Sequence, residues 1–99
     1  MRLIEKIGPA AMLEQTAEEC VELAQACLKY ARYLRGENPT FKNVGIIKDN
    51  MMEEIADVMI CISELNNSEY SSHVTVSDYI GKKAERMRKR FGDDKEYNL

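Results

Sequence analysis

The fold of this chain is decided by one long stretch, residues 9–35, which reads PAAMLEQTAEECVELAQACLKYARYLR. After its opening proline the stretch contains neither glycine nor proline, and good helix formers dominate it. Proline is favoured at the first helical position, and Gly36, followed by Pro39, is a typical stop signal. The stretch therefore predicts a single long helix from Pro9 to about Arg35.

Two further helices are expected downstream. One covers about residues 50–65, with residue 49 or 50 as its cap, and is closed by a polar loop. The other ends near residue 91 and begins after Thr75, where Thr75 and Asp78 resemble a capping box. Gly92 follows as a stop signal.

We find no strand pattern and no internal repeat, so the predicted fold is all-α. Two long helices joined by a short connection favour an antiparallel hairpin, to which the C-terminal helix is added. The 99 residues predict a single domain, with a core at about residues 9–91 and a loose tail. Phe41 is expected to tuck the connection of residues 36–49 back. Because so short a chain buries little surface by itself, its 44% hydrophobic residues favour a four-helix-bundle-like homodimer or homotetramer.

Two acidic clusters are the candidates for chemistry: EECVE at residues 18–22 and EEIAD at residues 53–57. Residues three apart on a helix share a face, and antiparallel pairing can bring the two clusters together. Like charges that close cost free energy unless a cation or protons neutralise them. The candidate ligands are Glu19, Glu22, Glu54 and Asp57.

A helical projection separates these carboxylates from ordinary surface charges. Glu19 and Glu54 fall among apolar neighbours, where an unpaired carboxylate is costly. Glu53 and Glu64 are expected to face water. The apolar arc of the first helix holds Leu13, Ala17, Cys20, Leu23, Ala24, Cys27 and Ala31, and the solvated face holds Glu14, Glu18, Gln25, Lys29 and Arg32.

An all-oxygen ligand set suits Mg²⁺, with Mn²⁺ able to substitute, better than zinc or copper. The single histidine, His73, lies in a polar loop and is expected at the surface. Cys20, Cys27 and Cys61 form no metal-binding pattern and are expected to be reduced core thiols. The alternative for the acidic clusters is that both are solvated helix faces, which charge runs usually are.

The third helix supplies positive charge in the run Lys82 to Arg90. Lys83, Arg86 and Arg90 share one face, and such side chains could hold phosphate oxygens that a metal ion leaves uncovered. A basic helix end without further function is the alternative. Nucleic acid is an unlikely partner because the net charge is −3 and no aromatic residues interleave the basic ones.

The two clusters, EExxE and then EExxD on adjacent helices, resemble the signature of MazG-like nucleoside triphosphate pyrophosphohydrolases. The flanking phrases EECVELAQA and EEIADV are similar to that family, as is Lys83-x-x-Arg86 downstream. The similarity extends over about residues 9–90. Either half of the signature is common alone, whereas both in this order are fairly specific.

The resemblance implies Mg²⁺ held by Glu19, Glu22, Glu54 and Asp57, and chains associated through the acidic helices. It implies cleavage of a nucleotide between its α- and β-phosphates, giving a nucleoside monophosphate and pyrophosphate. Lys83 and Arg86 are the expected phosphate contacts, although the position where many members carry Asn is Arg86 or Met87 here. Gln15 and residues 41–50 are candidates for the pocket that binds base and sugar.

Other functions remain open at this point. Phosphoribosyl-ATP pyrophosphohydrolase, an enzyme of histidine synthesis, shares the fold and the chemistry. A non-catalytic helical interaction module and a nucleic-acid adaptor are the alternatives from other classes. No run is apolar enough to span a bilayer, and the first residues lack the pattern of a signal peptide, so we expect a cytoplasmic protein without a membrane partner.

Overall fold

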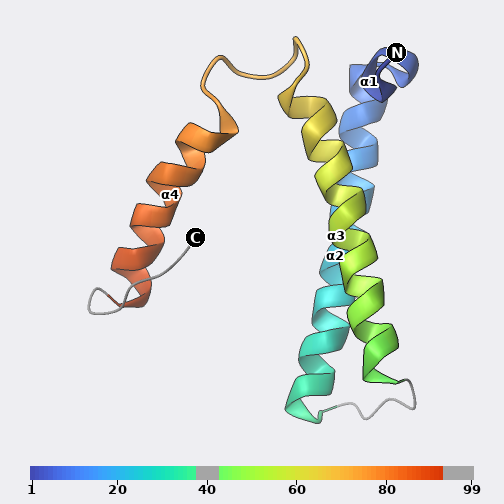
Figure 1. Cartoon of the computed structure of the whole chain (residues 1–99), viewed down its shortest axis with the longest axis vertical. Coiled ribbons are helices and arrows are strands. Elements are labelled where there is room, and N and C mark those ends of the chain that lie inside the picture. Colours follow the sequence, from blue (N-terminus) through green and yellow to red (C-terminus); the bar gives the residue numbers. More distant parts are fainter. Residues whose placement is uncertain (38–42, 93–99) are drawn as a thin grey trace.

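The computed structural model describes residues 1–37 and 43–92, and every regular element within these ranges is a helix. The helices are α1 (Leu3–Ile7), α2 (Pro9–Arg35), α3 (Val44–Asn66) and α4 (Val76–Phe91) (Figure 1). The expected all-α class is therefore confirmed for the described part of the chain. None of these helices combines the length and the apolar content that crossing a membrane requires.

Helix α2 has the bounds that its sequence predicts. Pro9 lies in its first turn, where the missing N–H removes no helical hydrogen bond. Gly36 ends the helix in the left-handed conformation, with φ 70° and ψ 14°, which a residue with a side chain adopts only with strain. The Gly36 N–H donates to the carbonyl oxygens of Arg32 and Tyr33, which satisfies acceptors that the helix end would leave open.

Helix α3 begins at Val44, earlier than the predicted start near Asn50. Asn43 is the cap, and its Oδ1 accepts a hydrogen bond from the Gly45 N–H at 2.6 Å. This capping hydrogen bond stabilises a helix start at Val44, although Gly45 in the first turn is a poor helix former. The predicted packing of Phe41 and the predicted loose tail lie outside the described residues.

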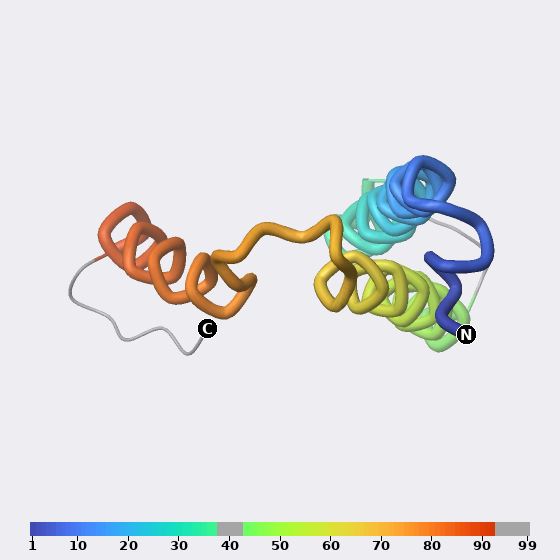
Figure 2. The backbone as a smooth tube through the Cα atoms, turned by 90° about the horizontal axis from the view of Figure 1, so that it is seen from above, coloured from blue at the N-terminus to red at the C-terminus, as the bar shows by residue number. Residues whose placement is uncertain are grey.

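Helices α2 and α3 lie side by side and run in opposite directions (Figures 1 and 2). A buried cluster of Ile4, Met12 and Cys61, with Leu65 packed against it, joins the first three helices. Met12 has 0% of its surface exposed, which makes it the centre of this cluster. The cluster fixes how α2 and α3 are aligned, and this alignment decides which of their side chains meet.

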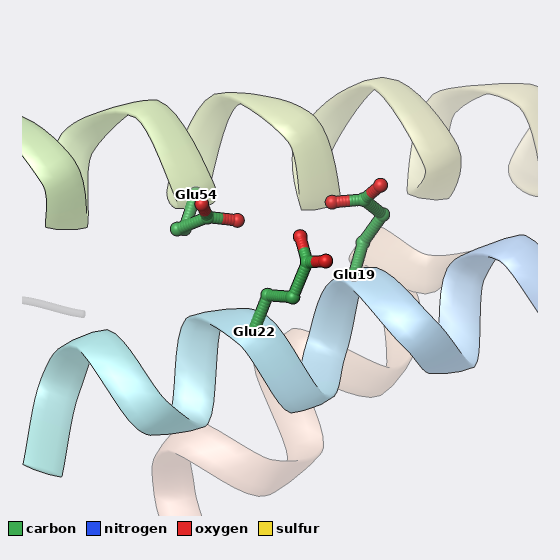
Figure 3. A group of neighbouring side chains, drawn as sticks. All are labelled: Glu19, Glu22 and Glu54. Carbon is green, nitrogen blue, oxygen red and sulfur yellow. The ribbon is translucent and has the colours of Figure 1, made fainter.

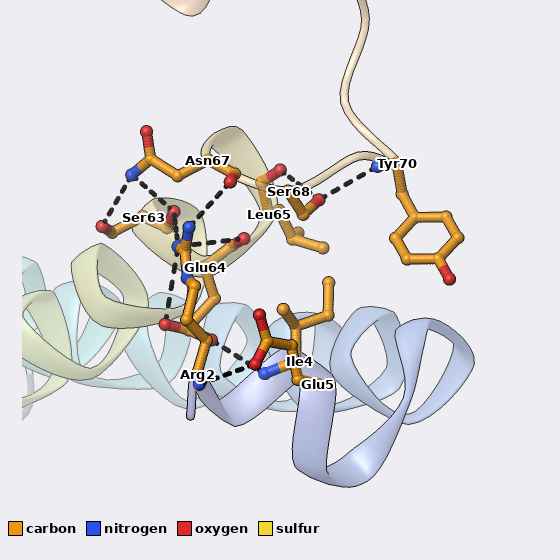
Figure 4. A network of polar contacts seen from close by, with 9 residues as sticks. All are labelled: Arg2, Ile4, Glu5, Ser63, Glu64, Leu65, Asn67, Ser68 and Tyr70. Atoms are coloured by element: carbon orange, nitrogen blue, oxygen red, sulfur yellow. Dashed lines mark hydrogen bonds and ion pairs between the residues drawn. The ribbon is translucent and has the colours of Figure 1, made fainter.

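Arg2 ties the start of the chain to the end of α3 (Figure 4). Its guanidinium donates to the carbonyl oxygens of Asn67 at 2.7 Å and of Ser63 at 3.1 Å, and pairs with the Glu64 carboxylate at 3.6 Å. Glu64 Oε1 also accepts the Ile4 N–H at 2.8 Å. The expectation that Glu64 faces water was therefore wrong, because α1, a helix that the sequence analysis did not predict, covers it.

Helix α4 begins as predicted. Thr75 Oγ1 accepts the Asp78 N–H at 3.1 Å, and the Asp78 carboxylate accepts the Thr75 N–H at 3.4 Å. The helix stands apart from α2 and α3 in both views (Figures 1 and 2). Its large apolar side chains are consequently exposed in the single chain; they are Val76, Tyr79, Ile80, Met87 and Phe91.

The apolar arc predicted for α2 is largely uncovered. Leu13 is 57% exposed, and Cys20 and Cys27 are exposed as well. Only Cys61 is a core thiol, so the expectation of three buried cysteines was wrong for two of them. The reason is that α3 covers the neighbouring strip of α2, which includes Met12 and Glu19, and leaves most of the arc on the outside.

Candidate functional site

Three carboxylates from two helices converge midway along α2 and α3 (Figure 3). Glu19 and Glu22 lie on one face of α2 because they are three residues apart, and Glu54 projects toward them from α3. One oxygen from each of the three side chains lies within 4.8 Å of the others. We call these three residues the carboxylate group.

Two oxygens of the carboxylate group are buried without a partner. Glu19 Oε2 and Glu54 Oε2 each expose less than 1 Å², and neither has a hydrogen-bond partner among the described residues. Glu22 is exposed. A buried oxygen that makes no hydrogen bond is costly, and a negatively charged one more so, unless a proton or a cation satisfies it.

Burial of Glu19 raises the pKa of its carboxyl above the ordinary 4.5. A hydrogen bond from Gln15 Nε2 to Glu19 Oε1, 2.8 Å long, lowers this pKa, whereas the charges of Glu22 and Asp57 raise it further. The net direction is upward, so the site disfavours the ionised form of Glu19 in the absence of a cation.

Asp57 lies near the carboxylate group without being one of its three members. Its charge raises the pKa of both Glu19 and Cys61, which places it within electrostatic reach of each. Of the four predicted ligands, the structure thus brings Glu19, Glu22 and Glu54 together and places Asp57, which is exposed, beside them.

The donors of this group fit a hard divalent cation. All three are carboxylate oxygens, the ligand type that Mg²⁺ prefers. Oxygens on one octahedral Mg²⁺ lie about 3.0 Å apart when adjacent and about 4.2 Å apart when opposite, because each is about 2.1 Å from the ion, so the three oxygens would have to move closer together to share one ion. Burial raises the pKa of the Cys61 thiol, which therefore stays protonated and is a poor ligand. His73 is exposed in the loop before α4.

A hollow of about 480 Å³ adjoins the carboxylate group and includes two of its members. It is lined by Glu22, Gln25, Ala26, Lys29, Ile47, Asn50 and Glu54. Gln25 and Lys29 were both predicted to lie on the solvated face of the first helix. Lys29 is instead half-buried, a position that only the packing of α3 against α2 reveals.

Lys83 and Arg86 lie on α4, away from the carboxylate group of the same chain (Figures 1 and 2). Lys83 lies beside an apolar surface that also includes Tyr79 and Met87. A single chain therefore does not bring the predicted phosphate contacts to the predicted metal ligands. Gln15, predicted for the pocket that binds base and sugar, donates its amide to Glu19 instead.

Comparison with protein-family models, with curated proteins and with solved structures found no match for this chain.

Proposed function

We propose that this chain is a MazG-like, Mg²⁺-dependent nucleoside triphosphate pyrophosphohydrolase. The observation that carries the proposal is the pair of buried, unpartnered oxygens on Glu19 and Glu54, which converge with Glu22 from two helices. These are three of the four positions at which the sequence resembles the family's metal-binding signature. Asp57, the fourth, follows Glu54 by three residues on α3 and is the proposed fourth ligand.

In the proposed reaction, the oxygen of a water molecule bonds to phosphorus at the α–β linkage and the bridging P–O bond breaks. The products are a nucleoside monophosphate and pyrophosphate. A bound divalent cation would supply Lewis-acid activation of water and of the phosphoryl oxygens. The chain's part is to hold the carboxylate group in place, and Gln15 does so for Glu19 through its amide.

Lys83 and Arg86 remain proposed phosphate contacts, on one condition. Because α4 stands apart from the carboxylate group of its own chain, these cations would reach a substrate only after a movement of α4 or from a second copy. The exposed apolar side chains of α4 favour the second copy, since burying them would stabilise such a contact.

A homodimer or homotetramer is part of the proposal. The accessible surface is 7915 Å², whereas a folded monomer of 11.4 kDa is expected to expose about 5,800 Å². The radius of gyration is 17.0 Å, against about 13 Å for a compact domain of this length. The excess of about 2,100 Å² per chain is about 4,200 Å² for two chains, which lies within the range of total area that obligate homodimers bury. Copies would meet over the exposed apolar arc of α2 and over α4.

The first experiment measures pyrophosphate release from a panel of ribo- and deoxyribonucleoside triphosphates and phosphoribosyl-ATP, with and without Mg²⁺. Glu54→Gln should abolish release, while Glu53→Gln, an exposed neighbour, should retain it. Cleavage of phosphoribosyl-ATP alone would reassign the substrate to that of histidine synthesis. If no nucleotide in the panel releases pyrophosphate, the non-catalytic interaction module becomes the favoured function. Sedimentation velocity decides between monomer, dimer and tetramer. A cytoplasmic location stays part of the proposal.

A further inference from the structure

The hollow beside the carboxylate group is an open depression with both charged and apolar residues in its lining. It is continuous with the group through Glu22 and Glu54, and its volume of about 480 Å³ lies within the range of ligand pockets. Ala26 follows Glu22 by one helical turn, and its small side chain leaves space there. Ile47, which is 1% exposed, contributes an apolar surface from α3.

Among the described residues that line this hollow, Lys29 alone carries a positive charge. It follows Glu22 by seven residues, which is two turns, so both side chains leave the same face of α2 about 10.5 Å apart along the axis. Asn50, on α3, precedes Glu54 by one turn and offers an amide with both donors and an acceptor. The hollow therefore runs from the carboxylates to a lysine, with amide groups between them.

This sequence of charges suits a polyphosphate. Carboxylates repel a triphosphate or pyrophosphate beside them unless a cation lies between the carboxylates and the phosphates or pairs with the far end of the phosphate chain. A cation held by the carboxylate group would neutralise one end of the phosphate chain, and the Lys29 ammonium can pair with its other end. Unlike Lys83 and Arg86, Lys29 lines the same hollow as Glu22 and Glu54 within a single chain.

We propose that this hollow binds the phosphate chain of the substrate and the pyrophosphate product, with Lys29 as its cation and Asn50 as a hydrogen-bonding partner. The proposal rests on the proposed function for the presence of the divalent cation, and it names the phosphate site of that same centre.

The test is pyrophosphate binding to the full chain in the presence of Mg²⁺, measured by calorimetry, because it does not depend on turnover. Lys29→Gln should weaken binding by about tenfold or more, as expected for the loss of one charge-assisted contact. Lys6→Gln, the same substitution at an exposed lysine of α1 outside the hollow, should leave pyrophosphate binding unchanged. Lys29→Arg keeps the charge and should retain most of the affinity.

A second variant keeps the test valid if substitution of the half-buried Lys29 prevents folding. Asn50→Asp is nearly isosteric at an exposed position, and its added negative charge should also weaken pyrophosphate binding by about tenfold. Mg²⁺ affinity without pyrophosphate should stay unchanged in Lys29→Gln, which separates a phosphate contact from damage to the carboxylate group.

The outcomes distinguish this inference from the proposed function. A wild-type chain that hydrolyses triphosphates, with Lys29→Gln and Asn50→Asp binding pyrophosphate normally, overturns the phosphate site and leaves the enzyme standing. A chain without hydrolysis that still binds pyrophosphate through Lys29 supports the site and overturns the enzyme. Absence of both hydrolysis and pyrophosphate binding overturns both.

Discussion

Addition of Mg²⁺ should raise the stability of this chain, and Glu54→Gln should remove most of that effect. Glu54 contributes a buried oxygen without a hydrogen-bond partner among the described residues, and it faces Glu19 and Glu22 from the opposite helix. An amide at this position has nearly the shape of the carboxylate but carries no charge. The substitution therefore tests the cation site with little disturbance of packing.

The magnitude follows from linkage between binding and folding. A ligand that binds only the folded state at ten times its Kd stabilises it by about 1.4 kcal/mol. For a domain of this size, this corresponds to a rise in Tm of about 6–11 °C. A variant that binds tenfold more weakly gains only about 0.4 kcal/mol at the same Mg²⁺ concentration, or about 2–3 °C.

The assay is thermal unfolding followed by circular dichroism over a series of Mg²⁺ concentrations at constant ionic strength. Glu53→Gln is the matched control, because Glu53 precedes Glu54 on the same helix and is exposed. Its Mg²⁺ response should equal that of the unaltered chain. Equal responses of all three proteins would refute the reasoning, since the effect would then come from general screening of surface charge.

Three further predictions concern the hydrogen bond that holds Glu19, the buried Cys61 thiol and the contact of Arg2 with the end of α3. Gln15→Met removes the amide that holds Glu19 and should weaken Mg²⁺ binding, measured by calorimetry, by about tenfold or more. Gln25→Met, at an exposed position, should leave the Mg²⁺ affinity unchanged, and equal affinities of the two variants would contradict the prediction. Burial raises the pKa of the Cys61 thiol above its ordinary 9.0, so the folded chain keeps this proton after the unfolded chain has lost it, and the free energy of unfolding should fall as pH rises above about 9. Urea unfolding at pH 7.5 and 9.5 should show that the free energy of unfolding falls less with pH in Cys61→Ala than in the unaltered chain. Equal falls in the two proteins would refute the raised pKa of Cys61. Arg2→Ala removes charge-assisted hydrogen bonds to the end of α3 and should destabilise the chain by about 1–2 kcal/mol, and an unchanged thermal midpoint would show that the contact is not stabilising.

Local signals predicted the helices well where caps and breakers decide them. Pro9, Gly36, Thr75 and Asp78 set helix ends through backbone conformation and hydrogen bonds between residues close in sequence. The start of α3 was misplaced because the cap is Asn43, and several polar residues ahead of an apolar run offer equivalent signals. The acidic spacing also predicted which carboxylates share a helix face.

The sequence by itself therefore determined the helices of residues 1–37 and 43–92 in outline and which carboxylates share one face of a helix, because both follow from interactions within one or two turns. Tertiary packing decided the rest. It selected which strip of α2 faces α3, so that Cys20 remained exposed while Glu19 was partly buried. It also placed Lys29 and Glu54 in the lining of one hollow and covered Glu64 with α1. These pairings join residues far apart along the chain, and their free energy depends on how whole helix faces fit together, which no local pattern encodes.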